Sequence, residues 1–304
     1  FGVPVEWRAI PSGGFTHAAP QGDRGIRWRL ALLALAGPAV NAAVAAAVWP
    51  WLPELTDGPA WRTPGVAVAA CWAGANAFIA VTSVLPYRQR SGIGPTPTDG
   101  LLALTALFAG PDAIDRWRAA RFQLEAGRLC EQRRFAEALQ VVRDGLTLLP
   151  DDENLQSLLG VVLVDVGRTE EARELFLAQL EGESPDLARA LTLNNVAWCD
   201  FLSGRDERLE EAEACSEEAL RLLPWFPAVQ STRGAVLVWS GRAEEALPLL
   251  QRAFEGVEQA APRASVACVR ALGLRQLGRT DQAKQALELA QTLDPACPLL
   301  QRVN

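Results

Sequence analysis

A small residue recurs through the second half of the chain, at intervals that fit pairs of helices. Five segments, which begin RFAEAL, RTEEAR, RLEEAE, RAEEAL and RTDQAK, each carry an alanine at the same aligned position, and successive alanines lie 34, 40, 34 and 37 residues apart. A period of this length predicts stacked units, none of which can bury its apolar face alone. The five alanines are Ala138, Ala172, Ala212, Ala246 and Ala283.

Each of these alanines follows another small residue on a preceding helix, and a Gly-Arg turn joins most of the pairs. The pattern resembles the tetratricopeptide repeat over about residues 119–296, in about five units. The resemblance implies an α-solenoid with a groove that binds a protein or peptide partner. Irregular spacing around Arg205–Glu210 predicts a longer turn in the third unit. The preceding small residues are Ala126, Gly160, Ala197, Gly234 and Ala271.

Two long uncharged runs precede the repeats. Residues 30–52 and 63–87 contain no Asp, Glu, Lys or Arg, and each can cross a hydrocarbon core of about 30 Å as a helix. A pair of buried helices in a soluble bundle could have the same composition, and this alternative stays open. Two such runs joined by a short polar loop favour membrane spans. The apolar run 101–109 is too short to cross by itself.

Arginines orient the two spans. They precede the first span and follow the second, so the positive-inside rule places both flanks and the repeats in the cytoplasm and the loop 53–62 outside. Arginine-rich, lysine-poor composition is typical of a GC-rich bacterial genome. We therefore expect a multi-pass protein of the bacterial cytoplasmic membrane. The flanking arginines are Arg24, Arg27, Arg29, Arg88 and Arg90.

The two parts of the chain differ in charge. Residues 1–110 hold seven basic and five acidic side chains, and residues 111–304 hold 22 and 31. The resulting net charge of −7 argues against a nucleic-acid partner. We predict a membrane domain over 1–110 and a repeat domain over 111–304. The predicted fold class is all-α: two transmembrane helices with a short β-like segment within residues 1–25, followed by the tetratricopeptide-repeat solenoid.

The six cysteines lie far apart, form no CxxC pair and have no histidine nearby. This spacing predicts small core residues in a reducing compartment. They are Cys71, Cys130, Cys199, Cys215, Cys268 and Cys297.

The first span carries a polar motif, and a second motif follows the next span. Gly37, Pro38 and Asn41 form GPxxN within apolar sequence, and Pro86 is followed by the Asp99–Gly100 pair. Together these motifs resemble the membrane core of the site-2 protease family of intramembrane zinc metalloproteases, over about residues 1–105. Residues 1–25 resemble the strand segment that follows HExxH in that family. Ser83 stands where the family has asparagine.

The resemblance implies roles for these residues. Asp99 would be the third zinc ligand, and Asn41 would bind substrate backbone or orient a ligand. From the residues alone, Asp99 is a turn residue that caps a short helix. Gly37 and Asn41 are then helix-packing residues, the glycine permitting close approach and the amide bonding across. Both interpretations stay open.

No HExxH occurs in the chain, and His17 is its only histidine. Zinc hydrolysis needs three protein ligands and a glutamate base, so the chain as given cannot be an active protease and contains no catalytic residue. It opens on Phe1 and contains no methionine, and we expect a fragment whose HExxH helix lies upstream. A degenerate relative is the alternative.

Three functions follow from these patterns. The leading one is a membrane-embedded zinc metalloprotease for regulated intramembrane proteolysis, with cytoplasmic repeats that recruit a protein partner. The alternative is a non-enzymatic adaptor that two spans anchor to the lipid bilayer. A third is a soluble protein whose first 110 residues cap the solenoid. Asn194 and Asn195, in the third unit, are candidate contacts to a peptide in the groove.

Overall fold

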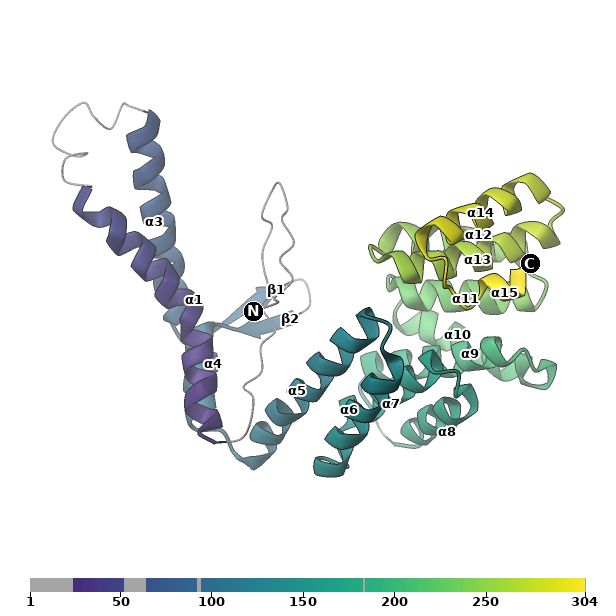
Figure 1. Cartoon of the computed structure of the whole chain (residues 1–304), viewed down its shortest axis with the longest axis horizontal. Coiled ribbons are helices and arrows are strands. Elements are labelled where there is room, and N and C mark those ends of the chain that lie inside the picture. Colours follow the sequence, from purple (N-terminus) through teal and green to yellow (C-terminus); the bar gives the residue numbers. More distant parts are fainter. Residues whose placement is uncertain (1–23, 52–63, 92–93, 183, 304) are drawn as a thin grey trace. The chain divides into compact units, whose positions relative to one another are not determined.

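The computed structural model describes residues 24–51, 64–91, 94–182 and 184–303 (Figure 1). They form two compact units, Phe1–Arg128 and Leu129–Asn304. The expected β-like segment within residues 1–25, His17 and the polar loop 53–62 lie almost entirely outside the described residues.

The first unit is built on a long helical hairpin. Helix α1 (Ile26–Val48) continues into the short helix η1 (Trp49–Trp51), and α1 packs along α3 (Pro64–Val84). Both helices coincide with the predicted apolar runs, although α1 begins four residues before the predicted span. Helix α1 continues through Pro38.

Helix α4 (Asp99–Leu107) packs against the first half of α1. Ala31 of α1 meets Ala103 and Ala106 of α4 in a small apolar cluster. The guanidinium of Arg27 donates a hydrogen bond of 2.9 Å to the carbonyl oxygen of Ala109. Helix α5 (Pro111–Glu131) follows and crosses the division between the two units.

The strands of the described chain form a hairpin between α3 and α4. Strand β1 (Arg88–Ser91) pairs antiparallel with β2 (Gly94–Pro97). The sequence did not indicate strands here, because β2 contains two prolines, which lack the N–H group that a strand donates. A two-stranded ribbon tolerates them because one edge of each strand is unpaired.

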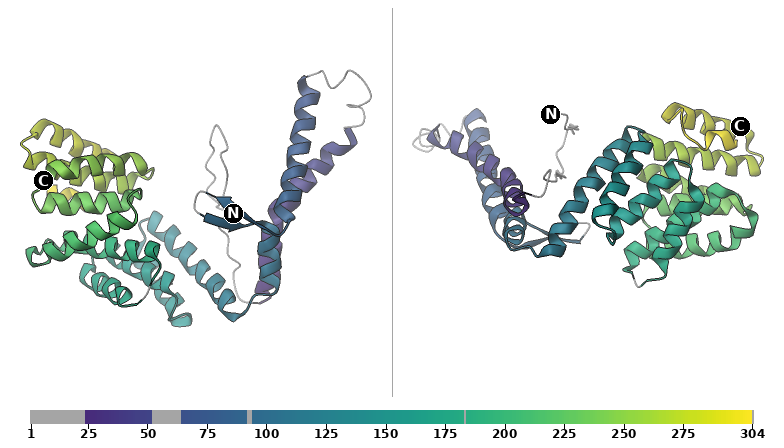
Figure 2. Two further views of the ribbon diagram at one scale, coloured as in Figure 1. Left: turned by 180° about the vertical axis from the view of Figure 1, so that it is seen from behind. Right: turned by 60° about the horizontal axis from the view of Figure 1, so that its bottom comes forward.

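The second unit is a stack of helical hairpins (Figures 1 and 2). Each helix packs against the next along the chain from α6 to α14. The helices are α6 (Phe135–Leu148), α7 (Glu153–Asp165), α8 (Thr169–Leu180), α9 (Asp186–Ser203), α10 (Leu209–Leu222), α11 (Pro227–Trp239), α12 (Ala243–Gly256), α13 (Ala260–Gln276), α14 (Thr280–Leu293) and α15 (Leu300–Val303).

The turns inside the hairpins share one backbone motif. Gly167, Gly241 and Gly278 have φ of 81°, 77° and 69°, the left-handed region that glycine adopts without strain. The next N–H then reaches back to the carbonyl five residues earlier, as from Arg242 to Leu237 at 2.8 Å, which satisfies a carbonyl at the helix end. Arg133 holds the equivalent place after α5 with φ of 58°.

The third hairpin departs from this motif, as its spacing predicted. Gly204 is left-handed, with φ of 64°, but the chain then forms the short helix η3 (Asp206–Arg208) before α10 begins. The longer turn is therefore confirmed.

The recurring small residues let paired helices approach closely. A Cβ atom added at Gly160 of α7 would lie 2.4 Å from the ring of Phe176 on α8. At Gly234 of α11 it would lie 2.6 Å from Leu250 on α12. Phe176 and Leu250 are fully buried. Each glycine therefore provides the space that a large side chain of the next helix fills.

We predict that Gly160→Ala destabilises the chain by about 1–3 kcal/mol, because the new methyl group overpacks the contact with Phe176. Gly127→Ala is the matched control. Gly127 also lies inside a helix, but its added Cβ would meet nothing within 4 Å, so the higher helix propensity of alanine should maintain or raise stability. Urea unfolding of the full chain in detergent measures both variants. Equal effects would contradict the packing argument.

Candidate functional site

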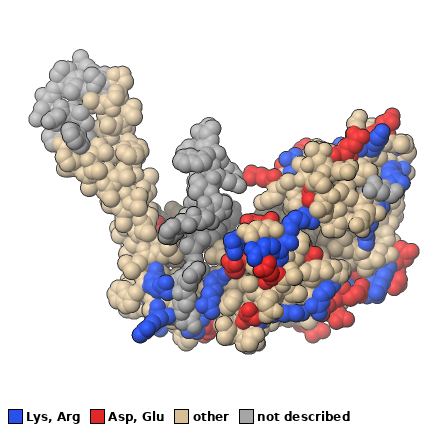
Figure 3. All heavy atoms as spheres, in the orientation of Figure 1, with Lys and Arg blue, Asp and Glu red and all other residues tan. Residues whose placement is uncertain are grey.

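The hairpin of α1 and α3 exposes an apolar surface. Both helices are long and apolar enough to cross a membrane, and only 17% and 11% of their most apolar 18-residue stretches are buried. In Figure 3 this hairpin shows almost no charged side chains along its length. A core helix of a soluble protein would be mostly buried. Large exposed side chains include Leu32, Val40, Val68, Phe78 and Val81.

The GPxxN residues take different positions on α1. Pro38 is buried and Asn41 is half-buried. Gly37 is exposed, and an added Cβ there would meet nothing within 4 Å. Among the described residues Gly37 thus makes no close helix contact, and the expectation that it permits one stays a prediction.

The close approach occurs instead at the Asp99–Gly100 pair. A Cβ at Gly100 would lie 1.7 Å from the carbonyl oxygen of Val84, near the end of α3. Only glycine fits at this junction of α4 with α3. Pro86 lies exposed in the segment between α3 and β1.

Thr98, not Asp99, caps α4. The Thr98 hydroxyl accepts a hydrogen bond from the N–H of Leu101 at 3.4 Å and donates one to the carbonyl of Leu85 at 2.6 Å. Asp99 occupies the first turn of α4, where the negative charge of a carboxylate interacts favourably with the helix dipole. The expectation that Asp99 is the capping residue is wrong, because the preceding threonine already fills that role.

The carboxyl group of Asp99 is half-buried, and burial raises its pKa. Among the described residues no group of three or more His, Cys, Asp or Glu side chains lies close enough to hold a metal ion. The described residues therefore do not by themselves form a three-ligand zinc site around Asp99.

The groove candidates lie next to one another on α9. Asn194 is buried, and its amide nitrogen donates to the Asn195 side-chain oxygen at 3.2 Å. The Oδ1 atom of Asn194 has no hydrogen-bond partner in the described part of the chain. A buried polar atom without a partner is costly. This oxygen is itself shielded from solvent, so the half-buried Asn195 is the more accessible amide of the pair.

The first helices of the hairpins differ in how much surface they offer. Helix α11 is buried along Val229–Val238, apart from the half-buried Ser231. In contrast, Val161 of α7 and Leu187 of α9 are 43% and 56% exposed. A partner therefore has more access to α7 and the start of α9 than to α11.

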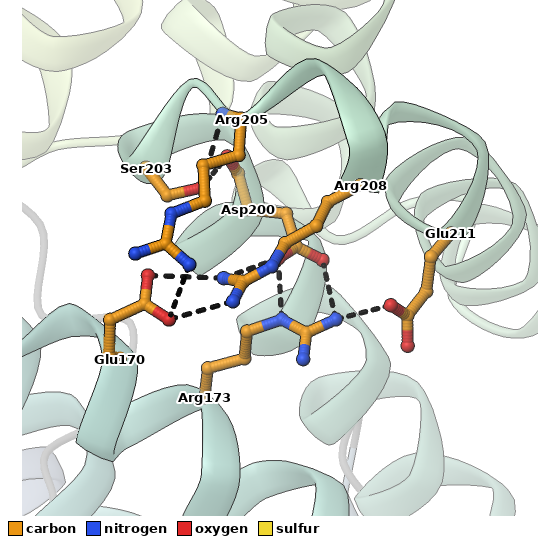
Figure 4. Close-up of polar contacts among 7 residues, drawn as sticks. All are labelled: Glu170, Arg173, Asp200, Ser203, Arg205, Arg208 and Glu211. Atoms are coloured by element: carbon orange, nitrogen blue, oxygen red, sulfur yellow. Dashed lines mark hydrogen bonds and ion pairs between the residues drawn. The ribbon is translucent and has the colours of Figure 1, made fainter.

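An ion network around the buried Asp200 lies beside the irregular third turn (Figure 4). Asp200 on α9 is fully buried and accepts a hydrogen bond of 2.5 Å from Nε of Arg173 on α8. Arg173 also pairs with Glu211 on α10. Arg208 of η3 donates to Glu170 of α8 at 2.8 Å and lies 3.6 Å from Asp200. These contacts tie the longer turn to the preceding hairpin.

Two opposing effects act on Asp200. Burial raises the pKa of its carboxyl group, while the hydrogen bond from Arg173 and the charge of Arg173 lower it. For Arg173, burial lowers the pKa but the interactions with Asp200 and Glu211 outweigh it, so the pKa is raised. The ion pair therefore offsets part of the cost of burying the carboxylate. Sequence reasoning missed this network, although an acid inside the apolar stretch AWCDFL was a signal.

Comparison with known proteins agrees with this architecture. Residues 264–297 match the tetratricopeptide repeat family model. This segment covers most of α13 and all of α14. No curated protein sequence matches the chain.

Solved structures with a similar arrangement are distant in sequence. A tetratricopeptide-repeat protein of Thermus thermophilus shares 19% identity over 60% of this chain and 95% of its own, with a TM-score of 0.49. A MamA protein shares 15% sequence identity over 59% of this chain and 92% of its own, with a TM-score of 0.37. MamA of Desulfovibrio magneticus shares 12% sequence identity over 60% of this chain and 97% of its own, with a TM-score of 0.39.

The second unit is thus a tetratricopeptide-like α-solenoid, as its matched repeat and its helical hairpins show. Repeats of this kind imply a protein-interaction domain.

We predict that Arg173→Met destabilises the chain by about 3–5 kcal/mol, because it leaves the buried carboxylate of Asp200 without its closest partner. Arg221→Met is the control, since the pair of Arg221 with Glu218 lies on the surface, where ion pairs contribute little. Urea unfolding of the two variants should separate them clearly. Similar midpoints would show that the network does not hold the third turn.

Proposed function

We propose that this chain is a membrane-attached interaction protein, in which the α1–α3 hairpin lies in the bilayer and the solenoid binds a protein in the cytoplasm. The exposed apolar surface of the hairpin carries the membrane part of this proposal. About 25 cal/mol per Å² of apolar surface is the cost of leaving such a surface in water. Insertion into lipid removes that cost, and the intrahelical hydrogen bonds satisfy the backbone there.

The charges beside the hairpin support the orientation. Arg24, Arg27 and Arg29 lie before or within the first turn of α1, and Arg88 follows α3. Trp28 and Trp49, near the two ends of α1, are 66% and 67% exposed, as interfacial tryptophans are. The start of α1 and the end of α3, from which the chain continues towards the solenoid, would then face the cytoplasm of a bacterium.

The full chain expressed in bacteria should sediment with membranes, resist extraction by alkaline carbonate and dissolve in detergent. Residues 111–304, expressed alone for comparison, should be released by alkaline carbonate from any membrane fraction with which they sediment. A full chain that stays in the supernatant without detergent would contradict membrane insertion and would favour the soluble alternative.

The partner site is proposed for the α7–α9 side of the solenoid. The half-buried Asn195 of α9 can contact a bound peptide, and the exposed Leu187 offers apolar contact at the start of the same helix. A photocrosslinking amino acid at Asn195 should therefore capture a defined protein in cells. The same group at Arg221, an exposed residue of α10, is the control. Identical products from both positions would contradict a specific site.

A more specific candidate is the site-2-protease-like core. One observation favours it: the helix with GPxxN packs against both α3 and α4, so the elements that carry the two motifs meet in one bundle. The described residues contribute only Asp99 to a metal site, and the remaining ligands and the glutamate base would have to come from residues outside the described chain.

The protease candidate makes its own prediction. In a protein that contains this chain together with an HExxH helix, Asp99→Asn should lower the zinc content and abolish cleavage of a membrane substrate. Asp112→Asn, in the first turn of α5, should preserve both. Unchanged zinc content in the Asp99 variant would leave the non-enzymatic adaptor as the function.

A further inference from the structure

The chain after α14 folds back onto the solenoid. Cys297, Leu299 and Leu300 are buried in the same apolar cluster as residues of α13. Helix α15 contacts both α13 and α14. We call residues 294–303 the C-terminal segment.

Contacts with distant parts of the second unit hold this segment at both ends. Arg133 donates hydrogen bonds of 2.9 Å to the Asp294 carboxylate and to the Ala296 carbonyl. At the other end, Arg302 donates to the carbonyl of Phe201 at 2.8 Å and lies 5.6 Å from the centre of its ring. The contact partners are more than a hundred residues away in sequence.

Two thiols meet between these anchors. The sulfur of Cys297 lies 3.7 Å from the hydroxyl oxygen of Ser265 on α13. Cys268 lies three residues after Ser265, on the same face of α13, and its thiol is hydrogen-bonded to that of Cys297. The two cysteines are 0% and 3% exposed.

The surroundings of Cys297 favour its thiolate. Hydrogen bonds from Cys268, Ser265 and the N–H of Leu299 lower its pKa against the effect of burial, while the pKa of Cys268 is raised. Other cysteines of the second unit differ. Burial raises the pKa of Cys130 and of Cys215 to about 11. Thiolates, not thiols, react with oxidants.

We propose that Cys268 and Cys297 are a dithiol–disulfide pair, oxidised by hydrogen peroxide, that fastens the C-terminal segment to α13. This inference does not depend on the membrane or on a partner protein.

The reaction balances with one peroxide for each pair. The Cys297 thiolate attacks a peroxide oxygen, the O–O bond breaks, and the products are a sulfenic acid and, after protonation, water. The Cys268 sulfur then attacks the Cys297 sulfur, so the S–S bond forms and the S–O bond breaks. The hydroxyl group leaves as a second water with the proton of Cys268. Both sulfurs are oxidised and the peroxide is reduced.

The fold determines how peroxide can reach Cys297 and how the disulfide would affect stability. Because Cys297 is buried, the segment must open locally before peroxide reaches the sulfur. The disulfide would close a loop that contains the whole of α14, which restricts the unfolded chain. The oxidised protein should therefore have a higher Tm than the reduced protein.

The test uses the full chain, purified under reducing conditions and treated with hydrogen peroxide. We expect the intact mass to fall by about two hydrogens, non-reducing peptide maps to link Cys268 to Cys297, Tm to rise, and dithiothreitol to reverse all three. Cys297→Ser should abolish these changes and Cys130→Ser should retain them.

Either of two results in the wild-type chain would overturn the proposal. One is no linked peptide under conditions that oxidise a model thiol; the other is over-oxidation of Cys297 to the sulfinic acid while Cys268 stays a free thiol. Because the wild-type peptide map decides the matter, a variant that fails to fold leaves the test intact.

Discussion

The solenoid depends on one steric constraint: a large side chain of each second helix must find space on the first. At Gly160 and Gly234 that space exists because there is no side chain at all, and Phe176 and Leu250 fill it. Close pairing then buries the face of each hairpin, and stacking buries the remainder. The left-handed glycines at the turns follow from the same constraint, since a short turn keeps the two helices antiparallel and in contact.

The same constraint explains what the sequence could predict. Small residues and turn glycines are local signals, so the helical hairpins and the longer turn near residues 205–210 were predictable and are confirmed. The ion network around Asp200 and the contact between Arg302 and Phe201 were not, because they join residues far apart in sequence. At the start of α4 the prediction was wrong in detail: a threonine and an aspartate can both cap a helix, and only the structure shows that Thr98 does so.

For the candidate functional residues, too, the sequence could predict some features and not others. GPxxN and the Asp99–Gly100 pair could be found from the sequence, but their physical roles could not. Gly100 accommodates the backbone of α3, whereas no described residue lies within 4 Å of a Cβ atom added at Gly37. Asn194 was a candidate because of its residue type and position, and the structure adds that its amide oxygen is buried without a described partner. In the function that we propose, the first unit contributes an apolar surface suited to lipid and the solenoid contributes a surface that binds a protein.

Reporter fusions test the central claim, that a membrane hairpin carries a cytoplasmic solenoid, most directly. Alkaline phosphatase is active only outside the cytoplasm. Green fluorescent protein reports the opposite location, because it fluoresces in the cytoplasm but not after export through the general secretory route. The account predicts active phosphatase when it is inserted in the loop 53–62 and fluorescence when the fluorescent protein follows Asn304. The account would be contradicted if phosphatase in that loop were inactive and the fluorescent protein fluoresced both in the loop and after Asn304.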